Sequence, residues 1–186
     1  MQPTEQLTVI LPAISELVDM IEPAQLHNPT PCTNFVLSDV LDHMIVLGGS
    51  LSYLFRGLQP PEPETRDDDG RVPAAEFRKV MHDLLDAVHT EGAMERTISS
   101  PVGEMPGDTF ARLVAFDGLV HGWDIATATG QPYDPPADLV AAVDGFARQA
   151  IADGMRDGDT FAVATEPPAG ATPIERLAAF TGRTVG

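Results

Sequence analysis

The sequence predicts an all-α protein, a helical bundle with little or no β-strand. Apolar residues recur every three to four positions through most of the chain, which gives each helix one apolar face. Segments in which apolar and polar residues alternate, as they do in half-buried strands, are almost absent. The predicted helices are joined by short to medium loops, and no internal repeat is visible. We therefore expect helices packed around one core.

The first two predicted helices span residues 4–21 and 36–55. Thr4 stands before the first apolar stripe as an expected N-cap. Pro12 lies off that stripe and is expected to kink the helix or restart it, because proline has no amide proton to donate inside a helix. The segment between the two helices, residues 23–34, is rich in turn-forming residues and predicts a loop.

A third helix is predicted over residues 73–91, with Pro73 in its first turn. His82 and His89 point away from its apolar face, so we expect them on the surface. The preceding segment, residues 59–72, reads QPPEPETRDDDGRV and has no periodicity. It is expected to be a linker or mobile loop, with its acidic run solvated and not bound to a cation.

The next segments predict a short extended pair and a long helix. Residues 97–103 lack helical spacing and could form the extended pair. The helix is predicted over residues 109–129, and Gly130 follows it as a C-cap glycine.

The C-terminal part predicts two more helices. One spans residues 136–152, with Gly154 and Gly158 ending it, and residues 161–164 are expected to form a short strand. The last helix begins with the sequence Thr-Pro-Ile-Glu at residues 172–175 and stops at Gly182. A threonine N-cap followed by proline and then glutamate is a capping box.

The composition restricts the classes of function. A chain of 186 residues with 43% hydrophobic residues suits one globular core. Its net charge of −17 repels phosphates and anionic lipids, so neither nucleic acid nor a membrane is an expected partner. The single cysteine allows no internal disulfide, and no leader or long apolar run is visible. We therefore expect a cytoplasmic protein.

Two ionisable side chains, Asp117 and His121, interrupt the apolar face of the predicted helix over residues 109–129. They lie one turn apart and are therefore neighbours, and such groups are costly to bury unless they are paired or bound. His43 lies on the inward edge of the second helix. Two imidazoles and one carboxylate suit divalent zinc, nickel, iron or manganese, and three protein ligands leave an open position. From the spacing alone, a buried Asp–His hydrogen bond without metal stays open as an alternative.

Four segments of the chain resemble one family. They are PTPCTNF at residues 29–35, DVLDH at 39–43, VHGWDIATATG at 120–130 and ERLAAFTGR at 175–183. In this order they resemble the mycothiol-dependent maleylpyruvate isomerase-like proteins of the DinB superfamily. The resemblance implies a DinB-like four-helix bundle with up-down-down-up connectivity and an extra C-terminal helix. It also implies a divalent metal, zinc first, held by His43, Asp117 and His121, and mycothiol or a similar thiol as a cofactor.

The chain departs from the family pattern in two respects. The pattern usually has glutamate where this chain has Asp117, and one methylene less moves the carboxylate by roughly 1.5 Å, whereas metal distances tolerate about 0.2 Å. The chain is also shorter than the two-domain isomerases, so part of their thiol-substrate pocket could be missing. We expect a bundle with the metal site over residues 1–158 and a short C-terminal extension, residues 159–186, packed on it.

Four other residues allow two interpretations each. Cys32 precedes a helix, where a thiolate is favoured, but the resemblance places it in a structural loop, which favours an inert thiol. Trp123 is expected to pack in the core and not to line a pocket. Asp124 is either a hydrogen-bond acceptor for His121 or an exposed helix charge. His27 is expected to be a hydrogen-bonded turn residue.

Three functional hypotheses follow. In the first, the chain is a thiol-dependent isomerase or S-transferase, whose metal on His43, Asp117 and His121 activates a small-molecule thiol for attack on a small electrophile. In the second, the bundle binds metal without turnover. In the third, it is structural and binds no metal. Homodimerisation, which the resemblance suggests for such bundles, is not indicated by any particular helix face.

Overall fold

The computed structural model describes residues 1–62, 70–100, 103–151, 156 and 161–186, and it confirms the all-α fold class. In these residues helices account for most of the secondary structure, and the strands form one small antiparallel pair. The elements are α1 (Pro3–Asp19), the 3₁₀ turn η1 (Pro23–Gln25), α2 (Leu37–Phe55), α3 (Ala74–Val88), β1 (Thr97–Ser100), β2 (Gly103–Pro106), α4 (Gly107–Thr129), α5 (Ala137–Ala150) and α6 (Pro173–Phe180).

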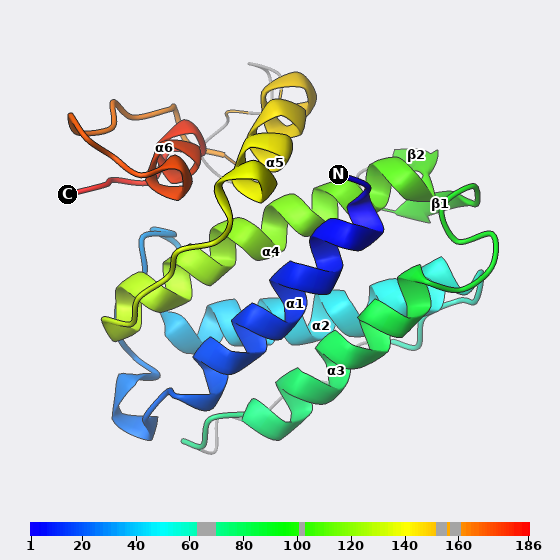
Figure 1. The fold of residues 1–186 in the computed structure, drawn as a ribbon. Helices are drawn as coiled ribbons and strands as arrows, with labels where there is room; N and C mark the ends of the chain where they lie inside the picture. The colour runs from blue at the N-terminus through cyan, green and yellow to red at the C-terminus, as the bar shows by residue number, and fades with distance from the viewer. Residues whose placement is uncertain (63–69, 101–102, 152–155, 157–160) are drawn as a thin grey trace.

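Helices α1 to α4 form a four-helix bundle (Figure 1). In Figure 1, α1 and α4 run in one direction and α2 and α3 in the other, so the connectivity is up-down-down-up. Two consecutive parallel helices need a long crossover, which the chain between Phe55 and Ala74 provides. This is the topology that the family resemblance implied.

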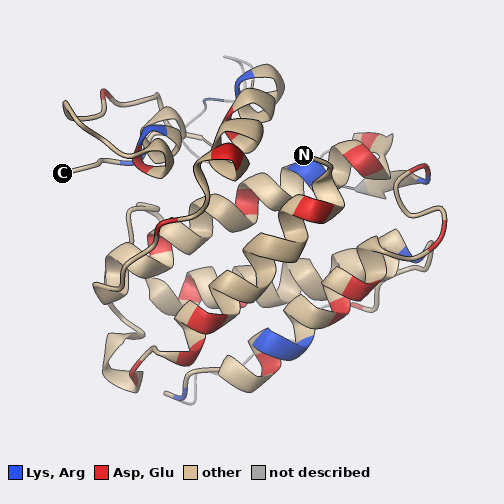
Figure 2. Ribbon diagram, viewed as in Figure 1, with Lys and Arg blue, Asp and Glu red and all other residues tan. Residues whose placement is uncertain are grey.

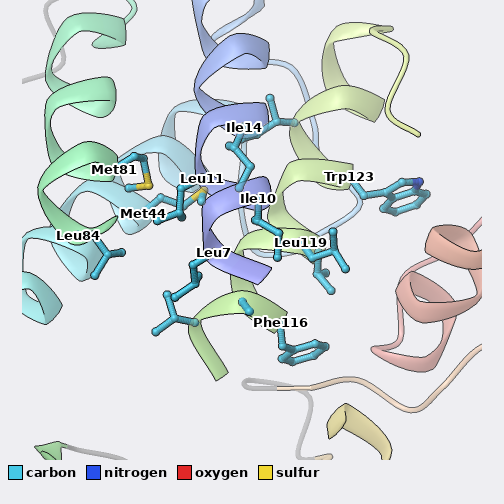
Figure 3. Close-up of a cluster of buried hydrophobic side chains, with 14 of the residues drawn as sticks. Leu7, Ile10, Leu11, Ile14, Met44, Met81, Leu84, Phe116, Leu119 and Trp123 are labelled. Carbon is cyan, nitrogen blue, oxygen red and sulfur yellow. The ribbon is translucent and has the colours of Figure 1, made fainter. Parts of the chain in front are cut away.

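The core of the bundle is built around α1, which packs against both α3 and α4, while α2 packs mainly on α3. Figure 3 shows the apolar stripe of α1 facing side chains of α2, α3 and α4. The stripe residues Leu7, Ile10, Leu11 and Ile14 are all buried. Within the described part of the chain, α2 and α4 make the smallest contact among the four neighbouring pairs of bundle helices.

The expected N-cap of α1 is wrong, and so is one of the two alternatives for Pro12. Gln2, and not Thr4, precedes the helix, and its amide donates to Glu5 Oε2 over 2.7 Å. The helix also does not restart at Pro12 but runs unbroken from Pro3 to Asp19. Pro12 and Thr8 are both exposed, so the carbonyl of Thr8, which Pro12 cannot bond, faces water. Solvation of this carbonyl lets the helix continue.

The extended pair predicted after α3 is confirmed as the antiparallel hairpin β1–β2, with Ile98 opposite Met105. The second strand continues to Pro106, and α4 begins at Gly107, slightly earlier than expected. Gly107 lies so close to the preceding segment that a Cβ there would be 1.9 Å from the carbonyl oxygen of Ala93. Only glycine therefore fits at this junction.

The C-terminal residues pack against α4 and α5 outside the bundle (Figure 1). The capping box of α6 is confirmed, because the Thr172 amide donates to Glu175 Oε2 over 2.6 Å. Gly130 ends α4 in the left-handed region, with φ of 71°, as predicted. The strand expected at residues 161–164 is wrong, because this segment lies beside α6 and the next residue, Thr165, donates its amide to Ala179. The expected helix stop at Gly154 and Gly158 and the boundary at residue 158 lie outside the described residues.

Acidic residues are distributed along the helices of the protein and are not gathered at one end (Figure 2). Each of the α-helices from α1 to α6 carries at least one aspartate or glutamate. In the described part of the chain, no helix combines the length and the apolar character that crossing a membrane requires.

Candidate metal centre

The seam between α2 and α4 brings together His43, Asp117 and His121. Nε2 of His43 and Nε2 of His121 each lie 3.5 Å from the same oxygen, Oδ1 of Asp117. One possible ligand atom from each residue can be chosen so that all three lie within 4.8 Å of one another. The two imidazole rings lie 5.1 Å apart, edge to face. Residues separated by more than seventy positions therefore direct their donor atoms at one point.

The helices explain this convergence. Asp117 and His121 are one turn apart on α4, so their side chains project on the same side. His43 lies in the first half of α2, on the side that faces α4, and the ring of Phe35 packs 5.9 Å from its own ring. The side chains of His43 and Asp117 are each 33% exposed, whereas that of His121 is 8% exposed. The cluster is therefore anchored in the interior and open to solvent on one side.

His121 is held from behind by Asp124, which is fully buried on the same helix. Nδ1 of His121 lies 2.9 Å from Oδ2 of Asp124. Burial opposes ionisation of Asp124, but the Arg183 guanidinium and His121 together keep the pKa of Asp124 below its usual value. An ionised carboxylate can only accept hydrogen bonds, so Nδ1 of His121 carries the proton. In the neutral imidazole the lone pair is then on Nε2, which faces Asp117.

Asp117 also remains ionised. Its burial favours the neutral acid, but His121 and His43 together lower the pKa of the Asp117 carboxyl below its usual value. The pKa of His43 is raised by the neighbouring Asp117, and burial opposes this shift only in part. The cluster thus has the negative charge and the paired imidazoles of a cation site.

The separations in the cluster are long for hydrogen bonds. An N–H···O bond is usually about 2.9–3.0 Å long, and Asp117 lies 3.5 Å from both imidazoles. Nε2 of His43 is buried and has no hydrogen-bond partner among the described residues. Two atoms bound at about 2.1 Å to a tetrahedral ion lie roughly 3.4 Å apart. The two separations from Asp117 are therefore longer than a usual hydrogen bond and close to the spacing of ligand atoms around a tetrahedral ion.

The other residues considered from the sequence have clear positions. Trp123 packs against the core, on the side of α4 away from α1 (Figure 3). His27, His82 and His89 are exposed. Cys32 is partly buried, and burial, the largest influence on it, raises the pKa of its thiol. A raised thiol pKa favours the inert over the reactive interpretation of Cys32.

Asp124 accepts from His121 and is not an exposed charge, which decides between its two interpretations. Arg183 was not singled out from the sequence, yet it donates from Nε and Nη2 to both oxygens of Asp124, over 2.8 and 2.7 Å. It is 59 positions from Asp124, and no local spacing connects the two. The only signal was its place at the end of the closing segment, residues 175–183, that carries the family resemblance.

Residues 8–126 match the family model described as the mycothiol maleylpyruvate isomerase N-terminal domain. The chain belongs to this family. Two uncharacterized proteins of Mycobacterium tuberculosis, from strains CDC 1551 / Oshkosh and H37Rv, are each 35% identical to the chain over 175 residues, which is 93% of this chain and 93% of theirs. His43, Asp117 and His121 all lie within the matched residues, whereas Arg183 lies beyond them.

Solved structures of the family have the same fold. A crystal structure of the mycothiol-dependent maleylpyruvate isomerase superposes with a TM-score of 0.56 at 17% identity, over 83% of this chain and 75% of that one. A histidine-to-alanine mutant of a mycothiol-dependent maleylpyruvate isomerase superposes with a TM-score of 0.56 at 14% identity, with the same coverage. At this identity the likeness establishes the helical fold of the family.

Proposed function

We propose that this member of the family binds a divalent ion through His43, Asp117 and His121 and uses it to activate a small-molecule thiol. Zinc is the first candidate, because two imidazoles and one carboxylate are a common ligand set for zinc, while nickel, iron and manganese accept the same donors. The thiol is mycothiol or a similar low-molecular-weight thiol, and its reaction partner is a small electrophile. The activity is that of an isomerase or an S-transferase.

One observation carries the proposal of an ion. Oδ1 of Asp117 lies at the same distance, 3.5 Å, from Nε2 of both histidines, and no proton is required between His121 and Asp117 because the proton of His121 is on Nδ1. In the neutral imidazole of His121 the lone pair of Nε2 faces the Asp117 carboxylate, and two such electron-rich groups repel one another unless a cation lies between them. The arrangement therefore supports an ion bound by these residues.

The exposure of the cluster supports catalysis at that ion. Three protein ligands leave at least one position open on a zinc ion, which distinguishes catalytic from structural sites. The Asp117 side chain is partly exposed, whereas Nε2 of His43 is buried, so a thiol would approach the open position from the side of Asp117. A divalent ion at this position would lower the pKa of a bound thiol or polarise a carbonyl group.

The family name supports the choice of thiol. The thiol would lose its proton, and its sulfur would then add to one carbon of an activated carbon–carbon double bond, whose π electrons move onto the adjoining carbonyl group as an enolate. In an isomerisation, rotation about the former double bond follows, the electrons return, the carbon–sulfur bond breaks and the released thiolate takes up its proton again. In an S-transfer the enolate carbon takes up the proton and the carbon–sulfur bond persists in the product. The buried Asp124 serves both by fixing the ring of His121.

The test is thiol-dependent turnover of the zinc-loaded protein, with maleylpyruvate and a set of activated electrophiles, in the presence and absence of mycothiol. We expect turnover that requires the thiol and that is lost in His43→Ala and Asp117→Asn. His82→Ala is the matched control, because His82 also faces an aspartate one turn away, Asp86 at 3.4 Å, but is exposed on α3. Metal binding without turnover would favour the non-catalytic bundle, and absence of metal the structural one.

A further inference from the structure

We propose that Arg183 is a positioning residue of the metal centre, which orients His121 through Asp124. The inference rests on the proposed function, because it concerns the same ion. It adds a part of the chain that lies outside the matched domain, since the family model covers residues 8–126. The C-terminal segment would then support the site on the side of His121 that faces away from the ion.

The geometry fixes both oxygens of Asp124. Arg183 Nε donates to Oδ1 over 2.8 Å and Nη2 donates to Oδ2 over 2.7 Å. Such a two-point pair defines the plane of the carboxylate, which a lysine cannot do because it is a single point charge. Oδ2, held in this plane, lies 2.9 Å from Nδ1 of His121. The plane of the carboxylate thus sets the direction of the imidazole ring and of its Nε2.

The guanidinium of Arg183 is itself held in place. Its Nη1 donates to Thr181 Oγ1 over 2.9 Å, and the side chain is 11% exposed. The backbone of Arg183 is bonded on both sides, since its amide donates to Ala178 over 3.2 Å and its carbonyl accepts from Thr165 Oγ1 over 2.6 Å. The turn after α6 therefore holds Nε and Nη2 of Arg183 in one orientation toward Asp124.

Coupling between two sites is reciprocal. If docking of this turn raises the affinity of the site for an ion, the ion must stabilise the docked turn by the same factor. Removal of a group that orients a metal-binding histidine typically lowers metal affinity by about 10- to 100-fold. Arg183 acts through one intermediate residue, so we expect the lower end of this range.

The first experiment measures zinc affinity by competition with a chelator for the wild-type protein, Arg183→Lys and Arg56→Lys. Arg56 is the matched control, because it forms the same two-point pair with Asp83, over 3.0 and 2.8 Å, between α2 and α3. We expect roughly tenfold weaker zinc binding in Arg183→Lys and unchanged binding in Arg56→Lys. Equal affinity in wild type and Arg183→Lys, or an equal loss in both variants, would overturn the inference.

The second experiment needs no zinc. Nitrogen-15 chemical shifts of the imidazole distinguish the two tautomers of a neutral histidine. In the metal-free wild type we expect His121 to be in the single tautomer with the proton on Nδ1, and we expect mixed tautomers in Arg183→Lys. A loss of stability alone would not produce this change. The same single tautomer in Arg183→Lys would contradict the proposed role.

The third experiment uses only the wild-type protein and remains decisive if Arg183→Lys does not fold. Amide hydrogen exchange is measured with and without zinc. The amides of Gly182 and Arg183 should exchange more slowly with zinc, because both belong to the docked turn. If zinc slows exchange near His121 but not at this turn, the coupling is absent. If the wild-type protein binds no zinc at all, the proposed function itself fails, which is a separate result.

Discussion

Nδ1 of His121 and Oδ2 of Asp124 lie 2.9 Å apart on one buried turn of α4. This pair fixes the proton of His121 on the side away from Asp117 and leaves Nε2 free to bind. Asp124 could not do this if it were neutral, and Arg183 and His121 outweigh its burial and keep its pKa low. The chemistry of the candidate site therefore depends on a carboxylate that does not itself face the site.

Asp124→Asn should strongly destabilise the metal-free protein. The change removes the carboxylate that pairs with the guanidinium of Arg183, which is 11% exposed. Removing one partner of a buried ion pair lowers the free energy of unfolding by about 3–5 kcal/mol. Urea denaturation of the metal-free variant measures this loss in the free energy of unfolding.

The control for that variant is Asp83→Asn, which breaks the pair with Arg56. Asp83 is 49% exposed, and exposed pairs contribute at most about 1 kcal/mol. Equal losses in the two variants would mean that Asp124 and Arg183 are not a buried pair in solution.

Asp117→Glu tests whether the short carboxylate is a working ligand. Oδ1 of Asp117 already lies 3.5 Å from both imidazoles, close to the spacing around a tetrahedral ion. An added methylene should move the oxygen away from this point and weaken zinc binding. We expect roughly tenfold weaker binding, which corresponds to a loss of about 1.4 kcal/mol in binding free energy. Chelator competition measures the dissociation constant for zinc. Tighter binding in Asp117→Glu would instead indicate that aspartate is the weaker ligand here.

Gly122→Ala should destabilise the protein, because a Cβ at Gly122 would lie 2.6 Å from the hydroxyl oxygen of Tyr133 and 3.3 Å from Ile14. Overpacking of this kind costs about 1–3 kcal/mol. Gly145→Ala is the matched control in α5, where a Cβ meets no atom of the described residues within 4 Å. It should stabilise the protein by up to about 1 kcal/mol, through helix propensity. The two thermal midpoints should therefore move in opposite directions from wild type.

Alkylation of Cys32 should be slower in the folded protein than in the urea-unfolded chain at neutral pH. Burial raises the thiol pKa, so at a given pH the folded protein contains less of the reactive thiolate. As pH increases, the alkylation rate of the folded protein should rise with a midpoint above that of the unfolded chain. A midpoint below that of the unfolded chain would identify Cys32 as an activated thiol and favour the reactive interpretation.

Periodicity predicted the helices of the bundle well, because each helix needs an apolar face to pack. It predicted the ends less well. Thr4 was a reasonable N-cap, but Gln2 and Glu5 begin the helix earlier through their own hydrogen bond. Pro12 was expected to kink or restart α1, and the helix does not restart, because the exposure of Pro12 makes the missing hydrogen bond tolerable. The end of a helix depends on such local contacts, which the apolar pattern does not contain.

The residues of the candidate site also divide into those that the sequence pattern predicts and those that it does not. The pair of Asp117 and His121 is local in sequence, so helical geometry alone placed its side chains together. His43 could be added because it lies on an inward helix edge and because the family resemblance includes it. Arg183 could not be added, because its link to Asp124 depends on how the turn after α6 docks on the bundle. The tautomer of His121 depends on that docking and is visible only in three dimensions.

The central claim is that His43, Asp117 and His121 bind one divalent ion. Elemental analysis of zinc-loaded protein, purified without a histidine tag and freed of loosely bound metal, tests it most directly. We expect one ion per chain in wild type and in His82→Ala, and close to none in folded His43→Ala and His121→Ala. Metal content that is unchanged in both of these variants, or absent from the wild-type protein, would contradict the claim.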